Sequence, residues 1–169
     1  MTTVIFSHGQ ESGPWGTKIR SMAERVKELG CAVGSIDYQG IADPGERVEK
    51  LIRECAGIDD SLVLVGSSMG WHVATAAAET AQAIGLFVLA PAYYMEGYED
   101  FTPPAPDMPI CIVHGWHDDI VPVENSIRFA RSCRATLHLV DGGHRLTDNI
   151  DEINVYLEQF IIRVLGDSR

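Results

Sequence analysis

The chain has 169 residues, which suits one domain, and its composition is 46% hydrophobic and 22% charged, as in an ordinary folded protein. Its formal net charge is −11 with only 13 lysines and arginines, which argues against a nucleic-acid partner because phosphate backbones are bound by clustered basic residues. The longest apolar runs have the length of strands and fall short of the roughly 20 residues of a membrane span, so no membrane partner is expected.

Short apolar runs alternate with longer amphipathic segments, which is typical of a parallel sheet covered by helices on both faces. Strands are predicted near residues 3–7, 32–37, 61–66, 85–90, 110–114 and 136–140. Helices are predicted over 18–29, from 44 onward, and over 69–82, 123–133 and 150–165. The first strand begins too early to leave room for a signal peptide, so a cytoplasmic protein is expected. The pattern predicts a single α/β domain over residues 1–169, with about six mostly parallel strands.

The strand predicted at 61–66 runs directly into Gly66-Ser67-Ser68-Met69-Gly70, a Gly-x-Ser-x-Gly pattern at a strand-to-helix turn. Such a turn holds a serine hydroxyl clear of the sheet, and its glycines let the helix and the neighbouring strand approach closely. Ser68 is therefore the candidate nucleophile, whereas Ser67 has no glycine two residues to either side. The alternative is that Ser68 only caps the following helix.

A serine nucleophile needs a base within hydrogen-bonding reach and a third group that orients the base. Carboxylates follow the strand predicted at 110–114, and Asp118 is preferred to its neighbour Asp119 as the acid. His144 follows the last predicted strand on a loop that contains Gly142 and Gly143, whose freedom allows the turn toward the sheet. His144 is the candidate base.

These pieces occur in a fixed order along the chain: His8-Gly9, Gly66-x-Ser68-x-Gly70, His114-Gly115-x-x-Asp118-x-x-Val121-Pro122 and Gly142-Gly143-His144. In this order they resemble the α/β-hydrolase superfamily, especially its small serine esterases of the carboxylesterase and dienelactone-hydrolase type. The resemblance covers nearly the whole chain. It implies a minimal α/β-hydrolase fold without the strands that precede the oxyanion strand. About twenty residues separate the strands at 85–90 and 110–114, which leaves no room for a helical lid.

The resemblance also implies a reaction. The three candidates would form a Ser-His-Asp triad that cleaves small carboxylic esters through an acyl-serine intermediate. The backbone N–H groups of Met69 and Gln10 would bind the oxyanion, with Glu11 as the alternative to Gln10. A thioesterase or a small-peptide hydrolase would use the same triad, and a triad-bearing interaction protein with little turnover is a further alternative. The expected partner is a small-molecule ester.

Other residues receive less specific predictions. Four aromatic side chains beside these loops are candidates for the walls of a substrate site, with plain packing as the alternative: Trp71, Tyr93, Tyr94 and Trp116. His8 is expected to bond the backbone of its own loop, and His114 to have a structural role. The four cysteines lack metal-type spacing and are expected to be reduced and mostly buried. No metal and no cofactor is predicted.

Overall fold

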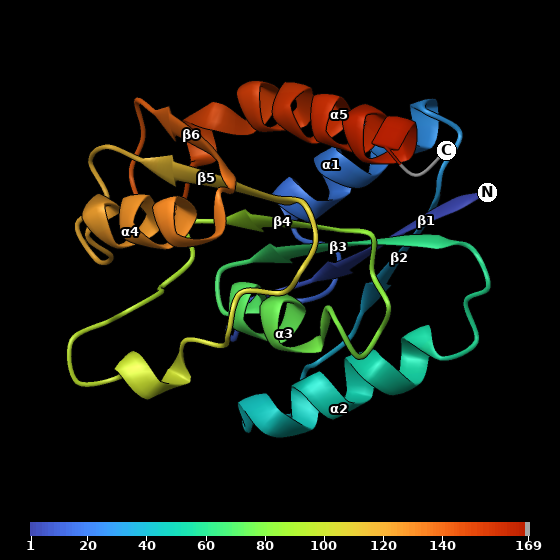
Figure 1. Ribbon diagram of the computed structural model, residues 1–169, viewed down its shortest axis with the longest axis horizontal. Helices are drawn as coiled ribbons and strands as arrows, with labels where there is room; N and C mark the ends of the chain where they lie inside the picture. Colours follow the sequence, from blue (N-terminus) through green and yellow to red (C-terminus); the bar gives the residue numbers. More distant parts are fainter. Residues whose placement is uncertain (168–169) are drawn as a thin grey trace.

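The computed structural model describes residues 1–167 and contains a six-stranded, fully parallel sheet in the order β2-β1-β3-β4-β5-β6. The strands are β1 (Thr2–Ser7), β2 (Ala32–Ile36), β3 (Ser61–Ser67), β4 (Gly85–Leu89), β5 (Ile110–Gly115) and β6 (Thr136–Val140). The helices are α1 (Thr17–Glu28), α2 (Pro44–Cys55), α3 (Gly70–Ala77), α4 (Val123–Cys133) and α5 (Ile150–Asp167), as Figure 1 shows. The predicted α/β class is confirmed, and every predicted strand end lies within one residue of the observed end.

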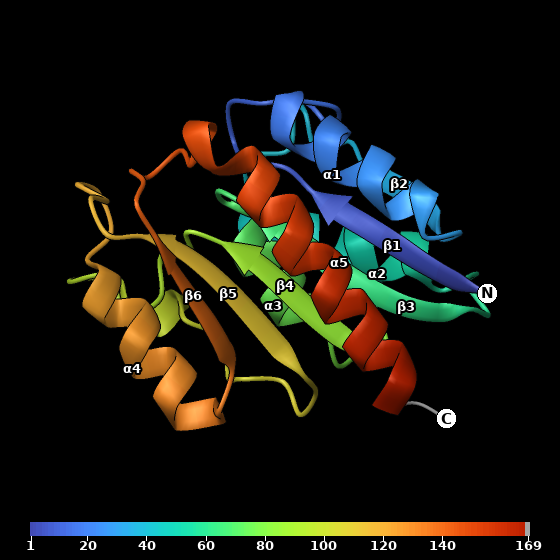
Figure 2. The ribbon, with the colours of Figure 1, turned by 90° about the horizontal axis from the view of Figure 1, so that it is seen from above.

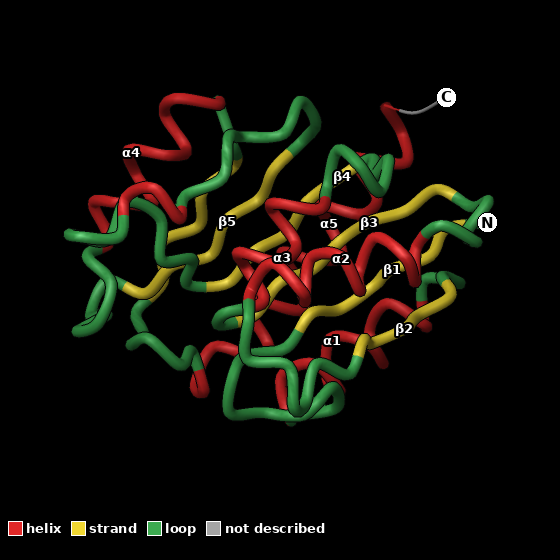
Figure 3. The backbone as a smooth tube through the Cα atoms, turned by 90° about the horizontal axis from the view of Figure 1, so that it is seen from below, coloured by secondary structure: helices red, strands yellow, loops and turns green. Residues whose placement is uncertain are grey.

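The sheet separates two apolar cores. Seen from above, α1 and α5 cross one face, where α1 buries Ile19, Met22 and Val26 at helical spacing (Figure 2). Seen from below, α2, α3 and α4 cover the other face (Figure 3). Because both faces are covered, the strands are nearly continuous apolar runs, which is why their ends could be predicted closely.

Local signals set most helix ends. The Asp43 carboxylate caps α2 by accepting the Glu46 N–H at 2.9 Å, and Pro44 occupies the first turn. Gly30, with φ +82°, ends α1 as predicted. The prediction for α3 was wrong at its carboxyl end, because the helix stops at Ala77 rather than at 82. Gln82 adopts φ +56° there and turns the chain toward β4.

The connections that leave the carboxyl ends of the strands lie at one edge of the sheet. The chain moves outward from β1 to β2 and then returns to β3 on the other side of β1, so the strand order reverses between β1 and β3. In open α/β sheets, ligands bind outside the carboxyl ends of the strands at this reversal. The loops after β1 and β3 are the ones that begin with His8 and Ser68.

The segment between β4 and β5 carries one 3-10 turn, Glu99–Phe101, and no larger helix, in agreement with the predicted absence of a lid. No helix within residues 1–167 combines the length and apolar character needed to cross a membrane.

Candidate active site

The turn after β3 has the geometry of a nucleophile elbow. Ser68 is exposed and adopts φ +54°, a left-handed conformation that a residue with a side chain occupies only at a cost on the order of 1–3 kcal/mol. A Cβ on Gly66 would lie 2.3 Å from the Gly70 carbonyl oxygen, and a Cβ on Gly70 would lie 1.9 Å from the Ser7 carbonyl oxygen. Only glycine fits at either position, so the spacing of the motif follows from how closely α3 packs on β1 and β3.

The capping alternative for Ser68 does not hold. Met69 occupies the N-cap position of α3, and no side chain there accepts a capping hydrogen bond. Within residues 1–167 the Ser68 hydroxyl has no hydrogen-bond partner. Ser67, in contrast, is buried in β3. The turn thus presents one unpartnered hydroxyl to solvent, and it belongs to Ser68.

Asp118 and His144 are joined as an acid–base pair. His144 Nδ1 lies 2.8 Å from Asp118 Oδ2, and the Asp118 side chain is fully buried. Its other oxygen, Oδ1, accepts the N–H groups of Ile120 at 2.9 Å and Val121 at 2.7 Å. Burial alone would raise the pKa of Asp118, but the hydrogen bonds from Val121, His144 and Ile120 lower it below the ordinary value. Asp118 is therefore a buried, ionised carboxylate, whereas Asp119 is exposed.

His114 supports this carboxylate, which confirms its predicted structural role, although the contact with Asp118 itself was not predicted. Its Nε2 lies 3.0 Å from Asp118 Oδ2 and 3.2 Å from the Val121 carbonyl oxygen, and its Nδ1 lies 2.6 Å from Ser126 Oγ. Burial lowers the pKa of His114, which keeps the imidazole neutral. With two oxygens facing Nε2, the proton belongs there, and Nδ1 accepts from the Ser126 hydroxyl. The four-residue separation of His114 and Asp118 was the signal available in the sequence.

Glycines also bring the His144 loop to the acid. A Cβ on Gly115 would lie 2.1 Å from the Gly142 carbonyl oxygen, so the end of β5 packs directly against the backbone that precedes His144. The structure therefore brings Asp118 and His144 together. Ser68 lies at the same edge of the sheet, but no hydrogen bond joins its hydroxyl to His144 in the described chain. Such bonds are often long in ligand-free enzymes and tighten when substrate binds.

The loop after β1 lies against the candidate nucleophile. A Cβ on Gly9 would lie 2.8 Å from Ser68 Cβ and 2.9 Å from Ser68 Oγ. Gln10 and Glu11 follow on an exposed stretch, and within residues 1–167 neither backbone N–H has a hydrogen-bond partner. The Met69 N–H stands at the start of α3, where helix N–H groups lack partners within the helix. Unpartnered donors therefore flank Ser68 on two sides, as an oxyanion site requires, and the choice between Gln10 and Glu11 stays a prediction.

The four aromatic candidates divide into two groups. Tyr93 is fully buried, with its ring stacked on Phe129 and its hydroxyl 3.0 Å from Thr75 Oγ1, and Trp71 packs against it with 8% of its surface exposed. Trp71 and Tyr93 are therefore part of the hydrophobic core beside α3, and their role is packing rather than contact with substrate. Tyr94 is half-buried, and Trp116 is 54% exposed. Tyr94 and Trp116 remain the predicted substrate contacts.

The remaining predictions concern histidines, cysteines and metals. His8 Nδ1 bonds the Gly9 carbonyl oxygen at 2.6 Å, which confirms its expected local role. All four cysteines are free thiols, and three of them are buried. No group of three or more histidine, cysteine or acidic side chains in the described part of the chain is arranged to hold a metal ion.

Cavities elsewhere do not include the candidate residues. One of about 270 Å³ lies between β6 and α5, and another of about 330 Å³ lies beside the end of α2 and the turn after α3. Neither is lined by Ser68, Asp118 or His144.

The chain matches a known protein family. The model of an uncharacterised protein family, UPF0227, matches residues 3–103. The chain belongs to this family. The UPF0227 match includes the loop after β1 and the elbow at Ser68 but ends before Asp118 and His144. No curated protein matches the chain.

Solved structures resemble the chain over nearly its full length. A Xanthomonas campestris pv. campestris protein assigned to the alpha/beta hydrolase superfamily is 29% identical, with a TM-score of 0.85, and the match covers 95% of this chain and 98% of that one. Alpha/beta hydrolase domain-containing protein 10 from mouse is 20% identical, with a TM-score of 0.78 and coverage of 96% and 90%. An α/β serine hydrolase without a lid from Xanthomonas campestris is 23% identical, with a TM-score of 0.73 and coverage of 96% and 81%. The chain therefore has the α/β-hydrolase fold, and the predicted resemblance is confirmed.

Proposed function

We propose that the chain is a serine hydrolase that cleaves small carboxylic esters through an acyl-serine intermediate. One observation carries the proposal: a buried carboxylate holds His144 at 2.8 Å on the same edge of the sheet as a strained, exposed and unpartnered serine. Strain of this kind persists where function uses it. The similar solved structures include proteins described as hydrolases and an esterase, which supports the same reaction class.

In the proposed reaction, Asp118 accepts the Nδ1–H of His144, so that Nε2 is free to take the Ser68 proton as Oγ attacks the ester carbonyl. The carbonyl oxygen becomes an oxyanion that accepts the N–H groups of Met69 and Gln10. As the intermediate collapses, His144 gives its proton to the alkoxide oxygen, the carbon–oxygen bond of the ester breaks, and the alcohol leaves an acyl group on Ser68. Water then attacks the acyl carbon while His144 takes its proton, and His144 returns that proton to Ser68 Oγ as the bond from Oγ to the acyl group breaks and the acid leaves.

The surroundings of Ser68 favour small, uncharged substrates. The absence of a lid leaves the edge of the sheet open, and the net charge of −11 disfavours the approach of anions. Large apolar side chains are exposed on the loops after β4 and β5, and they offer contacts for an acyl or alcohol group: Tyr98, Phe101, Trp116 and Ile120.

Turnover of a matched substrate series tests the proposal. The purified protein is assayed with p-nitrophenyl acetate, butyrate and octanoate, with an acetyl thioester and with p-nitroacetanilide. We expect turnover of the short esters, with an initial burst of about one p-nitrophenolate per chain where deacylation is slow. Ser68→Ala is the control and should lack both burst and turnover. A folded parent without ester turnover would contradict the proposal, and faster turnover of the thioester would favour the thioesterase.

A further inference from the structure

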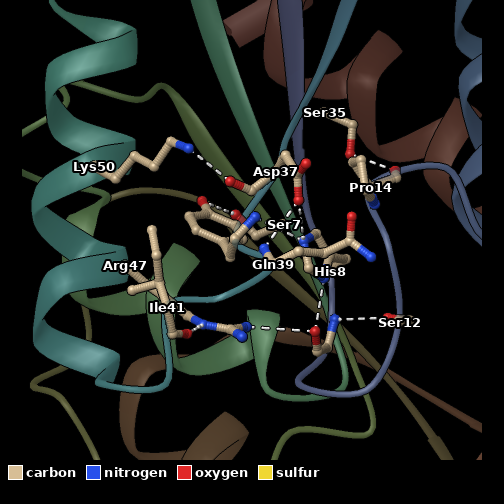
Figure 4. A network of polar contacts seen from close by, with 12 residues as sticks. Ser7, His8, Ser12, Pro14, Ser35, Asp37, Gln39, Ile41, Arg47 and Lys50 are labelled. Carbon is tan, nitrogen blue, oxygen red and sulfur yellow. Dashed lines mark hydrogen bonds and ion pairs between the residues drawn. The ribbon is translucent and has the colours of Figure 1, made fainter.

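The carbonyl oxygen of Gly9 is held from inside the protein by two side chains. His8 Nδ1 lies 2.6 Å from it, and Arg47 Nη1 lies 3.3 Å from it (Figure 4). His8 belongs to the loop itself, whereas Arg47 reaches it from the first turns of α2, 38 residues further along the chain. This carbonyl belongs to the peptide bond whose N–H is the Gln10 donor.

The ring of His8 can act here in only one neutral form. Its Nε2 lies 2.9 Å from the Tyr38 backbone nitrogen, which carries a hydrogen, so Nε2 accepts. Nδ1 must then carry the proton and donate it to the Gly9 oxygen. Burial lowers the pKa of His8 below its ordinary value, in agreement with a neutral ring. The nearby Asp37 carboxylate, 3.8 Å from Nε2, is more than half exposed.

Arg47 is a buried cation without a carboxylate partner. Its side chain is 2% exposed, its Nε donates to the Ile41 carbonyl oxygen at 2.7 Å, and its guanidinium lies 5.4 Å from the centre of the Tyr38 ring. No acidic side chain within residues 1–167 forms an ion pair with it. Buried charges are ordinarily paired because desolvation is costly, so a lone guanidinium directed at backbone carbonyls calls for an explanation.

The planarity of the peptide bond supplies that explanation. No peptide bond within residues 1–167 is cis, so the Gly9 C=O and the Gln10 N–H lie in one plane and point in opposite directions. With the carbonyl fixed toward His8 and Arg47 in the interior, the N–H is fixed toward the outside, where it has no partner. A Cβ on Gly9 would lie 2.9 Å from Ser68 Oγ, so the peptide bond that carries this N–H begins close to the candidate nucleophile.

We propose that Arg47 and His8 are positioning residues that fix the Gln10 N–H as an oxyanion donor, with the Arg47 charge polarising the peptide toward a stronger donor. The inference rests on the proposed function, because it assigns these residues to the oxyanion of that reaction. Hydrogen bonds from charged donors are about twice as strong as neutral ones. A guanidinium bound to the carbonyl oxygen draws electron density from the peptide bond, which makes the N–H of the same peptide a stronger donor. The same contacts favour Gln10 over Glu11 as the second donor.

Arg47→Met tests the inference, because methionine fills the buried space without donating a hydrogen bond. Three quantities are measured with p-nitrophenyl acetate and with a trifluoromethyl ketone that forms a tetrahedral adduct on Ser68: kcat, KM and the inhibition constant of the ketone. Removing one oxyanion donor costs about 10²–10³ in kcat, so misplacing one is expected to cost about 10-fold to 100-fold. KM should stay near the parent value, and the inhibition constant should rise by the same factor as kcat falls.

Two further variants keep structural and positioning roles apart. Arg47→Lys keeps the charge and one hydrogen-bond donor and should recover part of kcat. This variant also tests the inference if Arg47→Met fails to fold. Arg25→Met is the matched control: Arg25 bonds Glu158 between α1 and α5, away from the site, so its loss should lower the urea midpoint without changing kcat in the folded protein.

The outcomes separate the inference from the proposed function. If the parent is active and Arg47→Met has the same kcat and the same inhibition constant, the inference is overturned and the proposed function is not. The inference would also be overturned if Arg47→Met lost activity only in proportion to its loss of folded protein, while the remaining folded protein bound the ketone as tightly as the parent does. A folded parent that neither turns over esters nor forms the Ser68 adduct would contradict the proposed function and the inference with it.

Discussion

Replacing Asp118 by asparagine is expected to lower kcat by about 10⁴-fold while the protein stays folded. The Ile120 and Val121 N–H groups both donate to Oδ1, so the amide oxygen of an asparagine must take that position. Its NH₂ group then occupies the place of Oδ2 and faces His144 Nδ1 as a donor. His144 is forced to accept there and to carry its proton on Nε2, where it cannot take the Ser68 proton.

Asp119→Asn is the control for this substitution, because it removes the same charge from the neighbouring, exposed carboxylate. Initial rates with p-nitrophenyl acetate at saturating substrate give kcat for both variants, and urea unfolding confirms that each is folded. Asp119→Asn should remain near the parent kcat. Equal losses in the two variants would show that Asp118 acts only through the general charge of the loop, and the triad assignment would be wrong.

Gly70→Ala should have the largest effect on stability, with a loss on the order of 3 kcal/mol in the free energy of unfolding. The new Cβ would lie 1.9 Å from the Ser7 carbonyl oxygen, and its nearest neighbours are all backbone atoms of Ser7 and His8, so no flexible side chain can move away. Relief requires α3 to shift away from the end of β1, which also displaces Ser68. Activity should therefore fall together with stability.

Gly57→Ala is the matched comparison, because a Cβ there meets nothing within 4 Å. Urea unfolding followed by tryptophan fluorescence measures both variants. Gly57→Ala should lie within about 1 kcal/mol of the parent, since its main effect is on the entropy of the unfolded chain. A Gly70→Ala protein as stable as Gly57→Ala would contradict the close packing described for the elbow.

The sequence was most informative where structure depends on neighbouring residues. The elbow at Ser68 could be predicted because the contacts that forbid a side chain at Gly66 and Gly70 recur wherever a strand turns at once into a packed helix. Strand ends were predictable because the apolar runs are bounded by polar or turn residues. The end of α3 was missed because alanines favour helix beyond Ala77, whereas the return to β4 depends on how the helix meets the sheet.

Long-range packing accounts for what the sequence left open. Arg47 lies in an ordinary amphipathic helix, and only the docking of α2 beside the loop after β1 brings it to Gly9. Trp71 and Tyr93 could not be told apart from Trp116 in the sequence, because all three are aromatic residues near the site loops. Their burial depends on packing between distant elements, because Tyr93 lies between Trp71 on α3 and Phe129 on α4.

The most direct test of the central claim, an activated serine at position 68, is covalent labelling with a fluorophosphonate. The folded parent and Ser68→Ala are treated in parallel, and the products are read by intact mass and peptide mapping. We predict a single adduct on the parent, located on Ser68, and none on the variant. A folded parent that gains no mass would contradict the proposed serine hydrolase. Equal labelling of the parent and of Ser68→Ala would contradict it as well.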